Sequence, residues 1–200
     1  MKSKINELIA KIEDLQKELS KEYARLAEKY EYSFQKRKII FLEQMRQYHI
    51  HVRTGLVSYV LSASIRNILS APFIYAMIIP AVVLDLFLWM YQAFAFPLYQ
   101  IPKVKRSDYI VFDRRFLSYL NIIEKVNCMY CTYVNGLFAY AVEIGGRTER
   151  YWCPIKAARK PNYDPHQYYQ HFADYGDAET FKKISNDGGG FQKKRDSGDK

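Results

Sequence analysis

Three cysteines offer the most specific chemistry in this sequence. Cys128 and Cys131 stand at C-x-x-C spacing, and 21 residues separate Cys131 from Cys153. Thiolates in such patterns bind zinc or iron, form a switchable disulfide, or pack as small apolar side chains. An odd and small number of cysteines does not fit a secreted disulfide scaffold, and no signal-peptide pattern opens the chain. We therefore expect the thiols to face a reducing compartment.

The residues between the second and third cysteines predict a β-hairpin. Apolar and polar residues alternate from 137 onward, and two glycine dipeptides read as turn signals: Asn135-Gly136 and Gly145-Gly146. With the second dipeptide as the loop, Phe138 pairs with Cys153, which brings Cys153 close to Cys131. The charged residues around this turn are expected to form cross-strand ion pairs on a solvated face: Glu143, Arg147, Glu149 and Arg150.

Three converging thiolates supply three corners of a tetrahedral metal site, which needs a fourth ligand. His166 is the expected fourth ligand, with His171 and Asp164 as alternatives. The arrangement resembles a zinc-ribbon or rubredoxin-type knuckle, although no second cysteine follows Cys153. Zinc is the default metal for thiolate and imidazole ligands in a reducing compartment, and iron is the alternative. Redox-active thiols and buried structural cysteines are the competing interpretations.

A long uncharged stretch predicts attachment to a membrane. Between Asn67 and Pro102 the only formally charged residue is Asp85. A helix needs about 20 apolar residues to cross the hydrocarbon layer, so residues 71–99 are sufficient for one tilted span. Basic residues flank both ends and Pro80 favours a kink, so a single span and a re-entrant hairpin are both open. We expect Asp85 to lie at a helix boundary, near lipid headgroups.

Residues 1–50 predict one long helix, because no glycine or proline interrupts them before Gly55. Its apolar residues alternate steps of three and four, which is the seam of a coiled coil: Ile5, Leu8, Ile12, Leu15 and Leu19. The seam predicts self-association or docking onto a partner helix. Folding back onto the protein's own chain is the alternative.

Together these patterns predict a membrane-associated α+β protein in four parts. The parts are a coiled-coil-like helix over 1–54, a membrane-embedded segment over 55–102, a cysteine-containing α+β module over 103–185 and a disordered tail over 186–200. The net charge of +9 brackets the apolar stretch instead of forming one basic stripe. Membrane lipid is therefore the expected partner, and nucleic acid is not.

The functional hypothesis is a membrane-anchored, non-enzymatic adaptor or assembly protein with a small zinc module. Its N-terminal helix and its cysteine module are expected to face the cytoplasm. The alternative is a membrane-bound redox or metalloenzyme component with an iron–thiolate site. No nucleotide-binding loop, nucleophile elbow or H-E-x-x-H motif appears in the sequence, which favours the non-enzymatic hypothesis.

Overall fold

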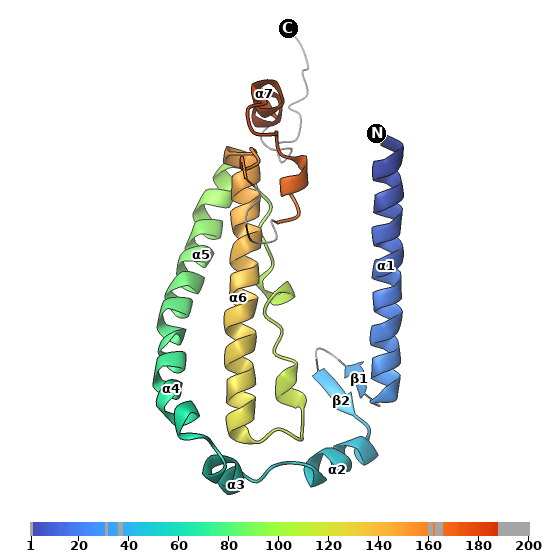
Figure 1. Cartoon of the computed structure of the whole chain (residues 1–200), viewed down its shortest axis with the longest axis vertical. Helices are drawn as coiled ribbons and strands as arrows, with labels where there is room; N and C mark the ends of the chain where they lie inside the picture. The colour runs from blue at the N-terminus through green and yellow to red at the C-terminus, as the bar shows by residue number, and fades with distance from the viewer. Residues whose placement is uncertain (1, 31, 36–37, 160–161, 163–165, 188–200) are drawn as a thin grey trace. The chain divides into compact units, whose positions relative to one another are not determined.

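The computed structural model describes residues 2–30, 32–35, 38–159, 162 and 166–187. These residues are mostly helical with one small two-stranded sheet (Figure 1). The chain divides into two compact units, one of residues 1–63 and 113–129 and the other of residues 64–112 and 130–200. The predicted α+β class is thus confirmed only coarsely, since the strands lie in a different part of the chain. The predicted disordered tail, apart from its first two residues, lies outside the described residues.

The first unit shows that the prediction of one helix over residues 1–50 is wrong. Its elements are α1 (Lys2–Lys29), β1 (Tyr32–Gln35), β2 (Lys38–Phe41), α2 (Glu43–His51) and α3 (Leu56–Leu61). Tyr32 pairs with Phe41 and Phe34 with Ile39 in an antiparallel register. In β1, Tyr32 and Phe34 alternate with polar residues at a period of two, which suits a strand better than a helix.

The seam of α1 is exposed among the side chains that the structure describes: Leu15, Leu19, Tyr23 and Leu26. The alternative in which this helix folds back onto its own chain therefore finds no support in these residues. Association through the seam stays a prediction.

The apolar stretch of the second unit forms α4 (Ile65–Ala76) and α5 (Ile78–Leu98). Together they are a run of 34 residues that is long and apolar enough to cross a membrane. Met77 interrupts the run three residues before Pro80, which has no N–H to donate to the carbonyl of Ala76. The chain continues in the same general direction through this kink (Figure 1). The reversal that a re-entrant hairpin requires is therefore absent from Ile65–Leu98.

The chain reverses after α5 and returns along it as an irregular segment, residues 101–112. Gln100 has a φ of 57°, and the N–H of Ile101 donates to the carbonyl of Phe96 over 2.9 Å, as in a Schellman helix end. One 3₁₀ turn interrupts this segment, Arg106–Asp108, and a second, Arg114–Phe116, lies in the irregular residues 113–121 of the first unit. A helix of 31 residues follows, α6 (Ile122–Trp152).

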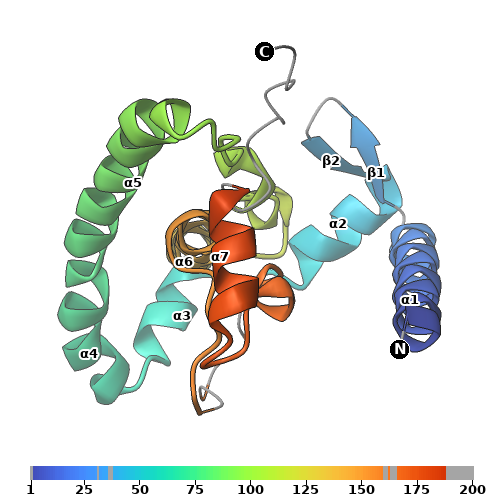
Figure 2. The same cartoon turned by 90° about the horizontal axis from the view of Figure 1, so that it is seen from above.

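Helix α6 occupies the residues for which the sequence predicts a β-hairpin, so that prediction is wrong. In the second unit, hydrogen bonds join later positions of the apolar stretch to later positions of α6, so the two run in the same general sense (Figure 1). Figure 2 shows that α5 is inclined to α6. Helices α5 and α6 and the returning segment all contribute to one core: Phe96, Ile101, Val104, Ile110, Leu137 and Ile144. A 3₁₀ turn (Tyr169–His171) and α7 (Ala178–Asn186) follow α6.

Candidate functional site

Helix α5 sorts its side chains by face. The residues that face α6 and the returning segment recur at steps of three and four: Ala81, Asp85, Leu88, Gln92 and Phe96. The outward face carries large exposed apolar residues: Ile79, Val82, Val83, Leu86, Phe87, Trp89, Met90 and Phe94. Only 6% of the most apolar window of α4 and α5 is buried. The helix therefore keeps its few polar groups inside the unit and turns apolar surface outward.

Asp85 lies inside α5 and is paired, so its predicted place at a helix boundary is wrong. Arg106 binds it with two hydrogen bonds, Nη2 to Oδ2 over 2.7 Å and Nε to Oδ1 over 3.1 Å. The hydroxyl of Tyr133 donates to Oδ2 over 3.0 Å, and the guanidinium also lies 5.8 Å from the centre of the Tyr133 ring. The hydrogen bond to Asp85 is the main cause that raises the pKa of Arg106. The carboxylate thus has three charge-stabilising contacts on the inner face of an apolar helix.

Gln92 continues this row of polar contacts two turns further along α5. Its amide nitrogen donates to the hydroxyl of Tyr140 on α6, and its amide oxygen accepts from the N–H of Val104 over 2.6 Å. Tyr91 hydrogen-bonds to Thr148 over 3.1 Å. A buried amide costs free energy unless it is paired, and here both its oxygen and its nitrogen are paired. Gln92 therefore ties α5 to both α6 and the returning segment.

Glu143 is the buried carboxylate of α6. It accepts hydrogen bonds from Arg147 Nε over 2.8 Å, from the Tyr168 hydroxyl over 2.6 Å and from Gln167 Nε2 over 3.1 Å. Arg147 also donates to the carbonyl of Pro102 over 2.5 Å. The predicted cross-strand ion pair is thus wrong: Glu143 and Arg147 are one helical turn apart on the same helix. We name this group of four side chains the Glu143 cluster.

His166 lies at the C-terminal part of α6 and not beside the C-x-x-C cysteines. Its Nε2 is 2.7 Å from Glu149 Oε2, and its ring packs on Phe172 at a centroid distance of 5.4 Å. A Cβ on Gly146 would stand 2.6 Å from the imidazole Cγ, so the missing side chain of Gly146 makes room for the ring. The histidine that was expected to complete a metal site is therefore a docking group against α6.

The predicted convergence of the cysteines does not occur. Cys153 directly follows the last residue of α6, 22 residues after Cys131, which corresponds to about 33 Å at 1.5 Å per residue. Cys128 and Cys131 are neighbours on α6, and all three thiols are free of disulfide bonds. Within the described part of the chain, no three His, Cys, Asp or Glu side chains form a group that could hold a metal ion. Zinc or iron binding stays a prediction, without the geometry on which it was based.

No protein-family model, curated protein or solved structure matches the chain. The class that the fold defines is a mostly helical protein with a small two-stranded sheet and one apolar helical stretch long enough to cross a membrane. Sequence reasoning missed the row of polar contacts. Its available signal was the spacing of Asp85 and Gln92, seven residues apart and thus on one helical face.

The Glu143 cluster makes stability depend on pH. Burial raises the pKa of Glu143, but the hydrogen bonds from Tyr168 and Arg147 together outweigh it, so the pKa is lowered. A carboxylate with a lowered pKa stabilises the fold above its unfolded pKa of about 4.3 and loses that contribution as the pH falls further. We expect Glu143→Gln to lower the free energy of unfolding by about 2 kcal/mol at pH 7, because charged hydrogen bonds are lost.

The measurement is urea unfolding of the detergent-solubilised protein between pH 7 and pH 3. The difference between wild type and Glu143→Gln should shrink as the pH falls below about 4.3. Glu179→Gln is the matched control, because Glu179 is exposed in the first turn of α7. A difference for Glu143→Gln that is constant over this range would show that its charge does not stabilise the fold.

Proposed function

We propose that this protein is a membrane-anchored, non-enzymatic adaptor or assembly protein that lies in one face of a bilayer. The observation that carries the proposal is the outward surface of α4 and α5, a run of 34 residues whose most apolar 18-residue window has a mean hydropathy of 2.2 and is only 6% buried. Contiguous apolar surface of this extent is typical of a membrane or protein contact and is unusual on a water-exposed face. Lipid is the occupant that suits a basic protein, since anionic headgroups attract lysine and arginine.

The returning segment favours attachment in the plane of the membrane over a span. Arg106 is level with Asp85, well inside the length of α5, and the residues around it are exposed: Lys103, Lys105, Ser107 and Asp108. Irregular backbone and exposed charges do not occur at the lipid-facing surface of a hydrocarbon layer. If α5 crossed the bilayer, this segment would be carried into it. With α5 lying along the interface, its apolar face enters the lipid and the charged segment stays in water.

The high hydropathy of α5 alone resembles that of a spanning helix. Interfacial helices usually carry their own polar face. Here the second unit supplies that polar side, because α6 and the returning segment cover the inner face of α5 and bind Asp85 and Gln92. The amphipathic element is therefore the packed unit as a whole. In-plane attachment keeps the whole chain on one side of the membrane, and the reducing compartment expected for the cysteines favours the cytoplasm.

The adaptor part of the proposal rests on α1. This helix is 28 residues long, and its described apolar seam residues from Leu15 to Leu26 are exposed. Such a seam buries its apolar side chains when it pairs with another helix, in a second copy or in a partner protein. The iron–thiolate alternative loses its support, because α6 holds Cys131 and Cys153 far apart.

Depth measurements in lipid vesicles test the in-plane attachment. In a variant with all three cysteines replaced by serine, single cysteines are placed at Phe73, Phe87 or Leu98, three exposed apolar positions. Each is labelled with a nitrobenzoxadiazole fluorophore in vesicles of phosphatidylcholine and phosphatidylglycerol. Quenching by lipids with shallow or deep spin labels should place all three at similar depths, about 5–10 Å below the headgroups. Binding should strengthen with the phosphatidylglycerol content.

A cysteine at Ser107 is the matched control, because this residue is exposed on the returning segment. It should react fully with a membrane-impermeant maleimide after vesicle binding. A fluorophore at position 87 that is much deeper than those at positions 73 and 98 would instead show a spanning helix. Failure to bind vesicles of any composition would show that the apolar face of α4 and α5 is not a membrane anchor.

A further inference from the structure

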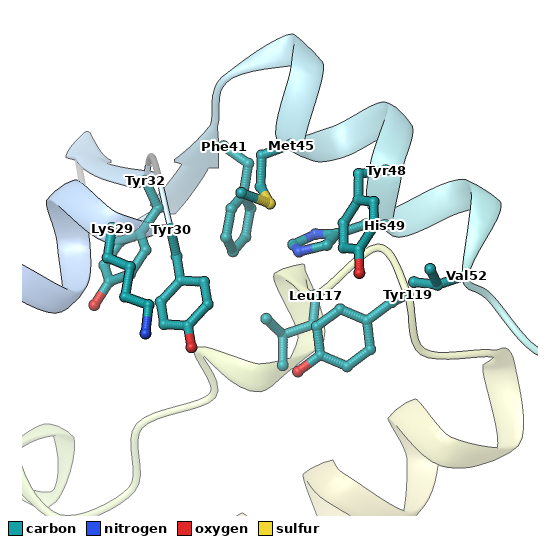
Figure 3. Close-up of a pocket in the computed structure, with 10 residues that line it drawn as sticks. All are labelled: Lys29, Tyr30, Tyr32, Phe41, Met45, Tyr48, His49, Val52, Leu117 and Tyr119. Atoms are coloured by element: carbon teal, nitrogen blue, oxygen red, sulfur yellow. The ribbon is translucent and has the colours of Figure 1, made fainter.

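The apolar seam of α1 can be assigned a partner from its own residue types. The seam residues whose side chains the structure describes, from Leu15 to Leu26, are between 42% and 63% exposed. Beyond them, Lys29 and Tyr30 belong to the body of the first unit, because they line a cavity of about 500 Å³ together with residues of the sheet and of α2 (Figure 3). Up to Leu26, the seam is therefore open to a helix of another chain.

Isoleucine and leucine are sorted along this seam. In heptad notation, steps of three lead from position a to position d, which gives the following assignment: Ile5 and Ile12 at a, Leu8 and Leu15 at d. In parallel coiled coils, where like positions pack together, β-branched residues at a with leucine at d favour two strands. In an antiparallel pair each a residue packs beside a d residue, so this sorting would have no such effect. The residue types therefore favour a parallel pair of helices.

The seam continues beyond these two heptads with one change of spacing. Leu19 occupies the next position a, and Tyr23 follows it after four residues where a heptad has three. A change of this kind unwinds a coiled coil locally without ending it. Leu26 then follows after three residues. From Ile5 to Leu26 the seam spans about 32 Å at 1.5 Å per residue.

The flanks of the seam fit an identical chain. In a parallel pair, position g of one helix lies beside position e in the next heptad of the other, and charges there set the choice of partner. Lys4 and Lys11 occupy g, and the residues that they would meet are the uncharged Ile9 and Gln16. A second copy therefore brings no like charges together. A different partner selected by charge would find no ionic contact at these e positions.

We propose that α1 pairs with α1 of a second copy in a parallel, two-stranded coiled coil. The inference rests on the proposed function, and it identifies the partner of the adaptor seam as the protein itself. Attachment to one membrane surface favours the pairing, because it raises the effective concentration of one copy around another. The pairing in turn joins two apolar anchors, which strengthens their hold on the same bilayer.

Disulfide cross-linking at two seam positions tests the pairing. In a variant with its own cysteines replaced by serine, a single cysteine is placed at Leu15 or at Leu26. The full chain is bound at low density to vesicles of phosphatidylcholine and phosphatidylglycerol. A parallel pair brings each position beside its own copy, so both variants should form covalent dimers on oxidation. Lys17→Cys is the matched control and should stay monomeric, because Lys17 is exposed at position f, on the far side of the helix from the seam.

Flotation of the same vesicles measures the anchoring separately. Protein that floats, but whose seam variants cross-link no more than Lys17→Cys, overturns the coiled coil and leaves the anchor. Cross-linked protein that does not float overturns the anchor alone, and protein that does neither overturns both. An antiparallel pair can bring at most one of the two positions beside its own copy. A covalent dimer from only one seam variant therefore overturns the parallel arrangement.

Energy transfer between labelled copies on vesicles measures the strength of the pairing. Leu15→Ala should weaken the association by about a thousandfold, because each dimer loses two buried leucine side chains. Lys17→Ala should leave it unchanged. Equal association of these two variants would overturn the proposal.

Discussion

Replacing Gly136 by alanine is expected to lower the free energy of unfolding by about 1–3 kcal/mol, which is the typical cost of overpacking. An added Cβ would lie 2.6 Å from the carbonyl oxygen of Tyr109 and 3.1 Å from the Cα of Ile110. Both are backbone atoms, so no rotamer change relieves the contact. Either α6 or the returning segment must move, and the packing of Leu137 and Ile110 in the core loosens. Urea unfolding followed by circular dichroism measures the loss.

Gly145→Ala provides the matched control on the same helix. No atom lies within 4 Å of a Cβ added there, so only the helix propensity changes. Alanine is favoured over glycine by about 1 kcal/mol in a helix interior, and this variant should be more stable than wild type. The two alanine substitutions therefore have opposite expected signs. If both stabilise the protein, the close approach of the returning segment to α6 is not what Gly136 provides.

These glycines also explain why the sequence of α6 resembles that of a β-hairpin. Glycine dipeptides are typical of turns, and alternating apolar residues between them predict strands. In α6, Gly136 and Gly146 instead stand where the returning segment and His166 touch the helix. The sequence around each glycine shows that a side chain is missing but not what packs in its place. The residues that pack against Gly136 and Gly146 are about 20 or more positions away in the chain, so local sequence patterns do not predict these contacts.

Other features were within reach of the sequence. Asn121 and Glu124 form a reciprocal capping box at the start of α6, with Glu124 N–H donating to Asn121 Oδ1 over 3.0 Å and Asn121 N–H donating to Glu124 Oε2 over 2.8 Å. This N-x-x-E pattern is a recognised helix start. The period-two pattern from Tyr32 to Gln35 was also an available signal for the first strand, where we had predicted a helix. The apolar stretch was correctly identified, because its length and composition do not depend on tertiary contacts.

The predicted convergence of the cysteines failed for a physical reason. Its prediction needed a chain reversal between Cys131 and Cys153, and a continuous helix cannot reverse. His166 illustrates the same dependence on tertiary structure, since its partner Glu149 became predictable only once α6 was known as a helix. The predicted cysteine convergence depended entirely on a turn at Gly145-Gly146, and these residues lie inside α6.

Breaking the contact between Arg106 and Asp85 is expected to have the second large effect. Arg106→Met should lower the free energy of unfolding by about 2 kcal/mol, below the usual cost of about 3–5 kcal/mol for a fully buried pair. The reduction reflects exposure, because the arginine side chain is 47% exposed while that of Asp85 is 17% exposed. The variant leaves a carboxylate on the inner face of an apolar helix, and among the described residues the Tyr133 hydroxyl remains as its hydrogen-bonding partner.

A double-mutant cycle separates the pair from its surroundings. Asp85→Asn should cost less than Arg106→Met, because a neutral amide remains where the charge was and can still accept from Tyr133. The double variant should be more stable than Arg106→Met alone, since it removes the unpaired charge and not merely its partner. Unfolding of all four proteins in one detergent gives the coupling energy. Additive costs would show that Arg106 stabilises the returning segment through packing alone. The charge of Asp85 would then not need Arg106 for its place on α5.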